Sequence, residues 1–85
     1  MTPSPRQNVQ PMPLAMLSPG ERARVVDVRG GRGFARRLTS LGVMPGTALE
    51  VVQNGLAGPL IVKLKESRLA LGRGMSHRIM VAPGE

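Results

Sequence analysis

The side chains that could carry out catalysis are few and lie far apart in this sequence. His77 is the only imidazole, Asp27 is the only aspartate, and cysteine is absent. The glutamates are scattered along the chain at Glu21, Glu50, Glu66 and Glu85. General acid and base catalysis needs positioned pairs of groups, and a tight metal site needs several ligands together. The sequence therefore predicts a protein that is not an enzyme and that has no intrinsic cofactor.

His77 is the one side chain for which metal binding needs separate consideration. Its alternation beside Ile79 and Val81 could place it on either face of the last expected strand. A structural role at the surface is the favoured interpretation, although a lone histidine can hold adventitious zinc, or another divalent metal, at an intermolecular contact. Ferrous iron needs several histidine or carboxylate ligands, which this chain cannot gather, so tight iron binding is not expected.

Positive charge is the strongest functional signal in the composition. The chain has 12 Lys and Arg against 5 acidic residues, and its formal net charge is +7. This balance favours an acidic partner, which could be nucleic acid, an anionic membrane surface or an acidic protein face. Barrels that bind single-stranded nucleic acid use exposed aromatic rings, whereas Phe34 is the only aromatic residue here. A protein partner is therefore expected, with nucleic-acid binding as the alternative.

Alternating apolar residues predict a mainly β fold. Leu60, Val62 and Leu64 give the clearest alternation. Five strands are expected, over residues 22–29, 47–53, 59–65, 68–71 and 77–82. Their connections are too short for parallel crossovers, so the sheet should be antiparallel, and it should curl into a small, partly open five-stranded barrel of SH3-like or OB-like shape.

One short α-helix is expected between the first and second strands. Phe34, Leu38 and Leu41 have the spacing of a single helical face and predict a helix over residues 32–41. Gly42 suits the left-handed residue that follows a helix, and Pro45-Gly46 favours a type II turn.

Composition also divides the chain and suggests its compartment. Residues 1–13 contain four prolines among polar residues and predict a flexible tail, so the folded domain is expected over residues 14–83. No apolar run is long enough to span a membrane, and no signal peptide is recognisable. The absence of cysteine fits a reducing compartment, so the cytoplasm is expected.

Several motifs follow one another over residues 14–83. They are Leu17-Ser-Pro-Gly-Glu-Arg-Ala-Arg-Val-Val26, Arg37-Leu-Thr-Ser-Leu-Gly-Val-Met-Pro-Gly46, Gly58-Pro-Leu-Ile-Val62, Leu69-Ala-Leu-Gly-Arg73 and Ile79-Met-Val81. Together they resemble the ferrous iron transport protein A family, FeoA, and the run over residues 37–46 is the most specific. The resemblance implies an SH3-like barrel in a cytoplasmic accessory protein. Its implied partner is FeoB, the membrane permease with a GTP-binding domain that imports ferrous iron.

The same domain occurs at the C-terminus of iron-dependent repressors, so the resemblance leaves an iron-regulatory role as an alternative. The expected partner surface joins the basic helix, the turn after it and the loop over residues 72–77. Its residues are Arg32, Arg36, Arg37, Met44, Pro45, Gly46, Arg73 and Met75. The alternative interpretation is that the arginines of the helix simply face solvent and contact no partner. Exposed Val52, Ile61 or Met80 could also allow self-association, so a monomer and a weak homodimer both stay open.

Overall fold

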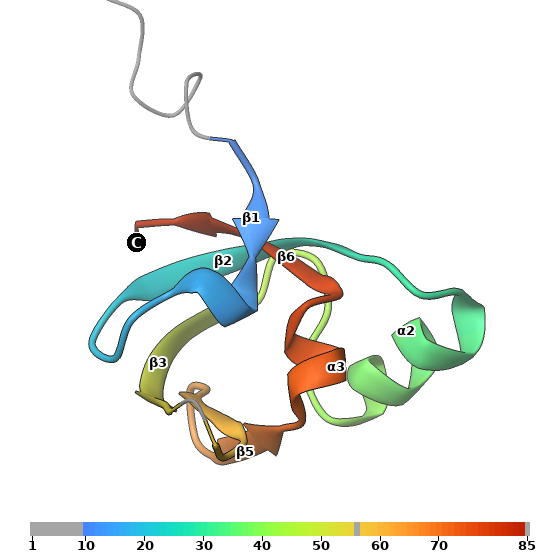
Figure 1. Ribbon diagram of the computed structural model, residues 1–85. Helices are drawn as coiled ribbons and strands as arrows, with labels where there is room; N and C mark the ends of the chain where they lie inside the picture. The colour runs from blue at the N-terminus through green and yellow to red at the C-terminus, as the bar shows by residue number, and fades with distance from the viewer. Residues whose placement is uncertain (1–9, 56, 85) are drawn as a thin grey trace, which may run out of the picture.

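The computed structural model describes residues 10–55 and 57–84, and it shows one antiparallel sheet with short helices at one end (Figure 1). The strands are β1 (Met12–Pro13), β2 (Arg22–Val28), β3 (Ala48–Asn54), β4 (Leu60–Lys63), β5 (Arg68–Leu71) and β6 (Ile79–Pro83). The helical elements are the 3-10 turn η1 (Leu14–Met16) and the helices α2 (Arg32–Ser40) and α3 (Arg73–Ser76). The strand order is β1-β6-β2-β3-β4-β5, and every neighbouring pair is antiparallel.

The sheet is strongly bent but not closed. Its register shifts between Val25 and Asp27 in β2 and between Val51 and Gln53 in β3, and such bulges increase the local bend and twist of a strand. The strand order begins at β1 and ends at β5, which are not neighbours, so both are edges. The predicted mainly β, antiparallel and partly open architecture is confirmed, with the expected helix as α2 between β2 and β3.

The core follows the alternation seen in the sequence. Leu60 and Val62 of β4 are completely buried and face the same interior as Val51 of β3. Leu38 is the residue that α2 buries completely, whereas Phe34 is half-buried against the edge of the core. Every strand except β1 contributes buried residues to the core. Met12 of β1 is partly buried and packs against the core from outside.

The two glycines that follow α2 adopt the predicted left-handed conformation. Gly42 has a φ of +92°, and its N–H donates to the carbonyl of Thr39 at 3.0 Å. The next N–H, of Val43, donates to the carbonyl of Leu38 at 2.8 Å, which completes a Schellman motif. Gly46 has a φ of +98°, and Thr47 N–H donates to the carbonyl of Met44 at 3.0 Å, as the expected type II turn requires.

Two apolar side chains lie differently from the sequence expectation. Leu41 was expected on the inner helical face, but α2 ends at Ser40 and the Leu41 side chain is 43% exposed. Met80 was expected at the surface, but it is 7% exposed and lies between Pro13 of β1 and Asp27 of β2 in the sheet. Val52 and Ile61 are half-buried.

The predicted tail overlaps the described chain only at residues 10–13. There Met12 and Pro13 pair with β6, so the sheet has a sixth strand that the sequence did not predict. Residues 1–9 of that predicted tail lie outside the described residues. In the described ranges, no helix is long and apolar enough to cross a membrane.

Candidate functional site

The outer face of α2 carries positive charge that no acidic side chain of residues 10–55 and 57–84 pairs with. Arg32, Arg36 and Arg37 are all exposed, because Leu38 turns toward the core. Within residues 10–55 and 57–84, the one ion pair joins Arg22 and Glu50 on neighbouring strands, at 3.6 Å. The three helix arginines therefore face solvent without an acidic partner in the described structure, and they are available to an external anionic group.

The exposed turn after α2 extends this basic face. Met44 is 40% exposed, and Pro45 and Gly46 are also exposed. The Arg24 guanidinium donates to the carbonyl of Gly46 at 2.8 Å, which ties the turn to β2. The Thr47 hydroxyl accepts the Met44 N–H at 3.2 Å. The turn thus holds a defined shape and exposes an apolar side chain, Met44, a few residues after the end of α2.

The residue that precedes β6 packs against α2 and adds a further cation. The Arg78 guanidinium lies over the Phe34 ring, 5.5 Å from its centroid. A Cβ on Gly30 would lie 3.0 Å from the Phe34 ring and 3.1 Å from Cδ of Arg78, so glycine permits the close approach. The Arg29 N–H donates to the carbonyl of Arg78 at 2.8 Å. Arg78 therefore lies beside the basic helix, and Phe34 is engaged under a cation rather than free to stack on a base.

The predicted residues of α3 are less accessible than those of α2. Arg73 is half-buried, and its guanidinium donates to the carbonyl of Gly55. Met75 is also half-buried and packs against the core. His77, which follows α3, is exposed, and the described part of the chain contains no group of three or more histidine, aspartate or glutamate side chains placed to hold a metal ion. The α2 arginines and the turn residues Met44, Pro45 and Gly46 are thus exposed, whereas Arg73 and Met75 make structural contacts.

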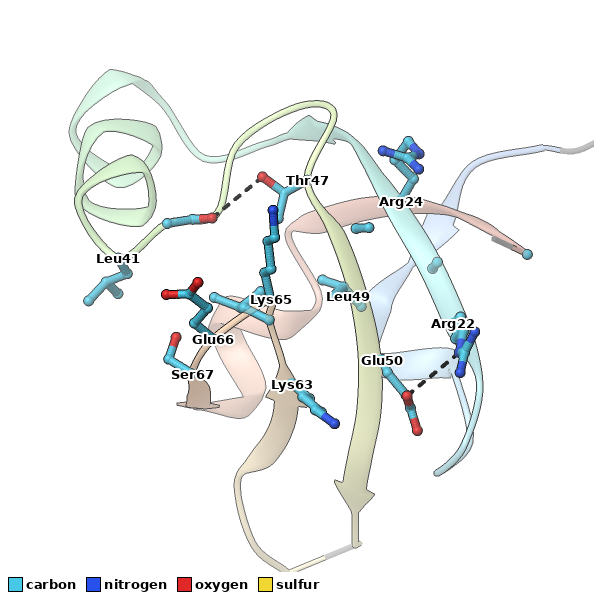
Figure 2. Close-up of a pocket in the computed structure, with 15 residues that line it drawn as sticks. Arg22, Arg24, Leu41, Thr47, Leu49, Glu50, Lys63, Lys65, Glu66 and Ser67 are labelled. Carbon is cyan, nitrogen blue, oxygen red and sulfur yellow. Dashed lines mark hydrogen bonds and ion pairs between the residues drawn. The ribbon is translucent and has the colours of Figure 1, made fainter.

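A groove that sequence reasoning missed lies along β2 and β3, beside the end of α2 (Figure 2). Its volume is about 910 Å³. The residues that line it are Arg22, Ala23, Arg24, Leu41, Gly42, Thr47, Ala48, Leu49, Glu50, Lys63, Leu64, Lys65, Glu66, Ser67 and Gly84. They come from five separate stretches of the chain, so no local motif could have revealed the groove.

Comparison with known proteins shows that this sequence matches one protein family. The model of the FeoA domain family matches residues 12–83. A protein of Methanocaldococcus jannaschii that carries the name Fe(2+) transport protein A is 40% identical over 73 residues, which are 86% of this chain and 88% of that protein.

Two solved structures are similar over most of the chain. The crystal structure of an iron uptake regulatory protein, FeoA, has a TM-score of 0.81 and 32% identity, and the match covers 89% of this chain and all of that one. The Stenotrophomonas maltophilia FeoA, crystallised with zinc and described as a prokaryotic SH3 domain protein, has a TM-score of 0.72 and 28% identity, covering 87% of this chain and 96% of that chain. The SH3-like form expected from the sequence is thereby confirmed.

Proposed function

This chain belongs to the FeoA family of ferrous iron transport accessory proteins, and we propose that it binds the cytoplasmic part of the FeoB permease and modulates iron uptake. The contact would be made by α2 and the turn that follows it. In this role the protein acts in the cytoplasm, reaches the membrane only through its partner, and carries out no catalysis. Ferrous iron is the cargo of the permease and is not held by this chain.

The observation that carries the proposal is the uncompensated charge of α2. Arg32, Arg36 and Arg37 project from one helix, and the described structure offers them no acidic partner. Charges arranged in this way speed encounter with an acidic protein face and fix its orientation. Met44, in the turn after the helix, is 40% exposed and supplies apolar area that a partner would bury.

Nucleic-acid binding and repressor-like regulation have less support. Single-stranded nucleic acid is usually bound by exposed aromatic rings, and Phe34, the only aromatic residue, lies half-buried under Arg78. If zinc binds, we propose that His77 captures it together with groups from a neighbouring molecule, because His77 is exposed and the described chain offers no complete ligand set.

The test is a binding titration between this protein and the soluble GTP-binding domain of FeoB. We expect the double charge reversal Arg36→Glu with Arg37→Glu to weaken binding by about tenfold or more, since two favourable contacts become repulsive. A matched control reverses Arg68 and Arg29, which are exposed cations outside α2 and the following turn. The control should lose much less affinity. Equal affinity of the α2 variant and the unchanged protein would refute the assigned surface.

A further inference from the structure

We propose that the groove along β2 and β3 is a second binding site, and that it takes an extended acidic peptide segment with leucine-like side chains from a protein partner. None of Arg32, Arg36 and Arg37 lines this groove, so the site is separate from the arginine-bearing helix face proposed for FeoB, although Leu41, Gly42 and Thr47 bring it next to the turn after α2. The inference does not rest on FeoB binding. It rests on the apolar lining, on the surplus of cations and on the size of the hollow.

The apolar lining is assembled from distant parts of the chain. Ala23 of β2 lies directly opposite Leu49 of β3, and both belong to the core at 2% and 5% exposure, so they underlie the groove and the exposed Ala48 is the apolar residue that β3 presents beside them. Leu64, which follows β4, and Leu41, which follows α2, complete the apolar part of the wall. The Schellman motif ends the helix before Leu41, which leaves this side chain 43% exposed at the groove. An apolar side chain of a ligand could therefore pack against Leu41 and Leu64 at one end of the groove.

The charge of the groove is positive even after its own acids are counted. Four of its lining residues are cations, Arg22, Arg24, Lys63 and Lys65, and two are acids, Glu50 and Glu66, so the difference is +2. Glu50 is already engaged, because it lies opposite both Arg22 and Lys63 in the sheet and pairs with Arg22 at 3.6 Å. The surplus of positive charge favours carboxylates in the ligand.

The form of the groove favours a peptide over other anionic ligands. Its volume of about 910 Å³ lies near the upper end of the range for ligand pockets, about 300 to 1,000 Å³, so it has room for several residues. It has no aromatic side chain on which a base could stack. A lipid surface is flat, whereas the apolar residues here line a hollow (Figure 2). Acidic residues alternating with leucine match both the cations and the apolar wall.

The decisive experiment measures fluorescence anisotropy of a labelled peptide, Asp-Leu-Glu-Glu-Leu-Asp-Leu, titrated with the full chain. We expect saturable binding that Lys63→Glu with Lys65→Glu weakens by about tenfold or more. The matched control is Arg29→Glu with Arg68→Glu, which changes the net charge equally at exposed cations that do not line the groove. The control should change the affinity by less than about threefold. Equal losses in the two variants would show that the peptide senses only net charge, and would overturn the proposal.

A second pair of variants tests the hollow itself. Ala48 is exposed and lines the groove, whereas Ala70 is exposed on β5 and does not. Ala48→Phe should fill the groove and reduce peptide binding about tenfold or more, and Ala70→Phe should leave it unchanged. Circular dichroism of each variant confirms that it is folded.

No saturable peptide binding would overturn the proposal. It would also be overturned if an oligonucleotide or anionic phospholipid vesicles displaced the peptide better than unlabelled peptide does. Loss of FeoB binding in the α2 variants leaves this test unaffected, so the two proposals can fail separately.

Discussion

Gly42 is the residue on which both the end of α2 and the edge of the groove depend. Its φ of +92° reverses the chain, so that Leu41 stays at the surface and Val43 enters the core. A Cβ at this position would lie 3.6 Å from Leu64, which is an ordinary contact. The requirement for glycine is therefore conformational rather than steric.

Replacing Gly42 by alanine should lower the free energy of unfolding by about 1 to 2 kcal/mol, because a Cβ is strained in the left-handed region. Gly33 provides the opposite control. It lies inside α2 with normal helical geometry and with nothing within 4 Å of an added Cβ. Gly33→Ala should therefore raise stability by about 0.5 to 1 kcal/mol. Urea unfolding followed by circular dichroism measures both changes, and equal effects of the two substitutions would contradict this account.

The N-terminus of helix α2 lacks the capping hydrogen bond and the acidic residue that would stabilise it. Its cap is Gly31, which makes no side-chain hydrogen bond, and its first turn contains no acidic residue. Arg32 instead places a positive charge where the helix dipole favours a negative one. A cation at this position costs stability, which is consistent with its use in binding.

Arg32→Glu should therefore stabilise the fold and weaken FeoB binding at the same time. The expected gain is about 0.3 to 1 kcal/mol, since a carboxylate near a helix N-terminus is favourable. Thermal unfolding at low ionic strength measures the gain, and the FeoB titration measures the loss. Arg32→Gln, which only removes the charge, should give an intermediate result for both quantities. A less stable Arg32→Glu protein would show that Arg32 makes a structural contact.

The elements that the sequence predicted are those with a clear local pattern. The helix was found from Phe34 and Leu38, and the buried face of β4 from Leu60 and Val62, because these spacings are the periods of a helix and a strand. The strand β1 was missed since two residues, one of them Pro13, give no alternation. Proline fits there because β1 is an edge strand, where a missing N–H costs nothing in the ladder.

Across the whole molecule, the net charge of +7 is balanced by little internal pairing. The one ion pair in residues 10–55 and 57–84 is Arg22 with Glu50, and both side chains are partly exposed. Repulsion among the cations should therefore destabilise the folded state at low ionic strength.

Sodium chloride should accordingly raise the midpoint of thermal unfolding. We expect an increase of a few degrees between about 0.02 M and 0.5 M, because the Debye length shortens from roughly 20 Å to about 4 Å. The same salt should weaken binding of FeoB and of the acidic peptide. A matched series with the Arg36→Glu and Arg37→Glu variant should show a smaller increase. A midpoint that falls with salt would mean that attractive pairs outweigh the repulsion.

The candidate sites differ in how far the sequence could predict them. Arg32, Arg36 and Arg37 were predicted from local helical spacing, and α2 presents them on its exposed surface. The groove could not be predicted, because it needs Ala23 opposite Leu49 and Leu64 close to the end of α2. Such pairings depend on sheet register over long sequence separations. The accessibility of Arg73 and Met75 was also beyond local reasoning, since it depends on the loop and core that they touch.

The pairing of β1 with β6 has a practical consequence for how the protein can be handled. Met12 lies opposite Val81, and the Gly84 N–H donates to the carbonyl of Arg22 at 2.8 Å, so both described ends of the chain leave from the β1, β6 and β2 side of the molecule. Helix α2 lies at the far side of the ribbon (Figure 1). An affinity tag fused ahead of Gln10 would therefore anchor the protein to a sensor chip with its arginine-bearing helix turned toward the flowing analyte.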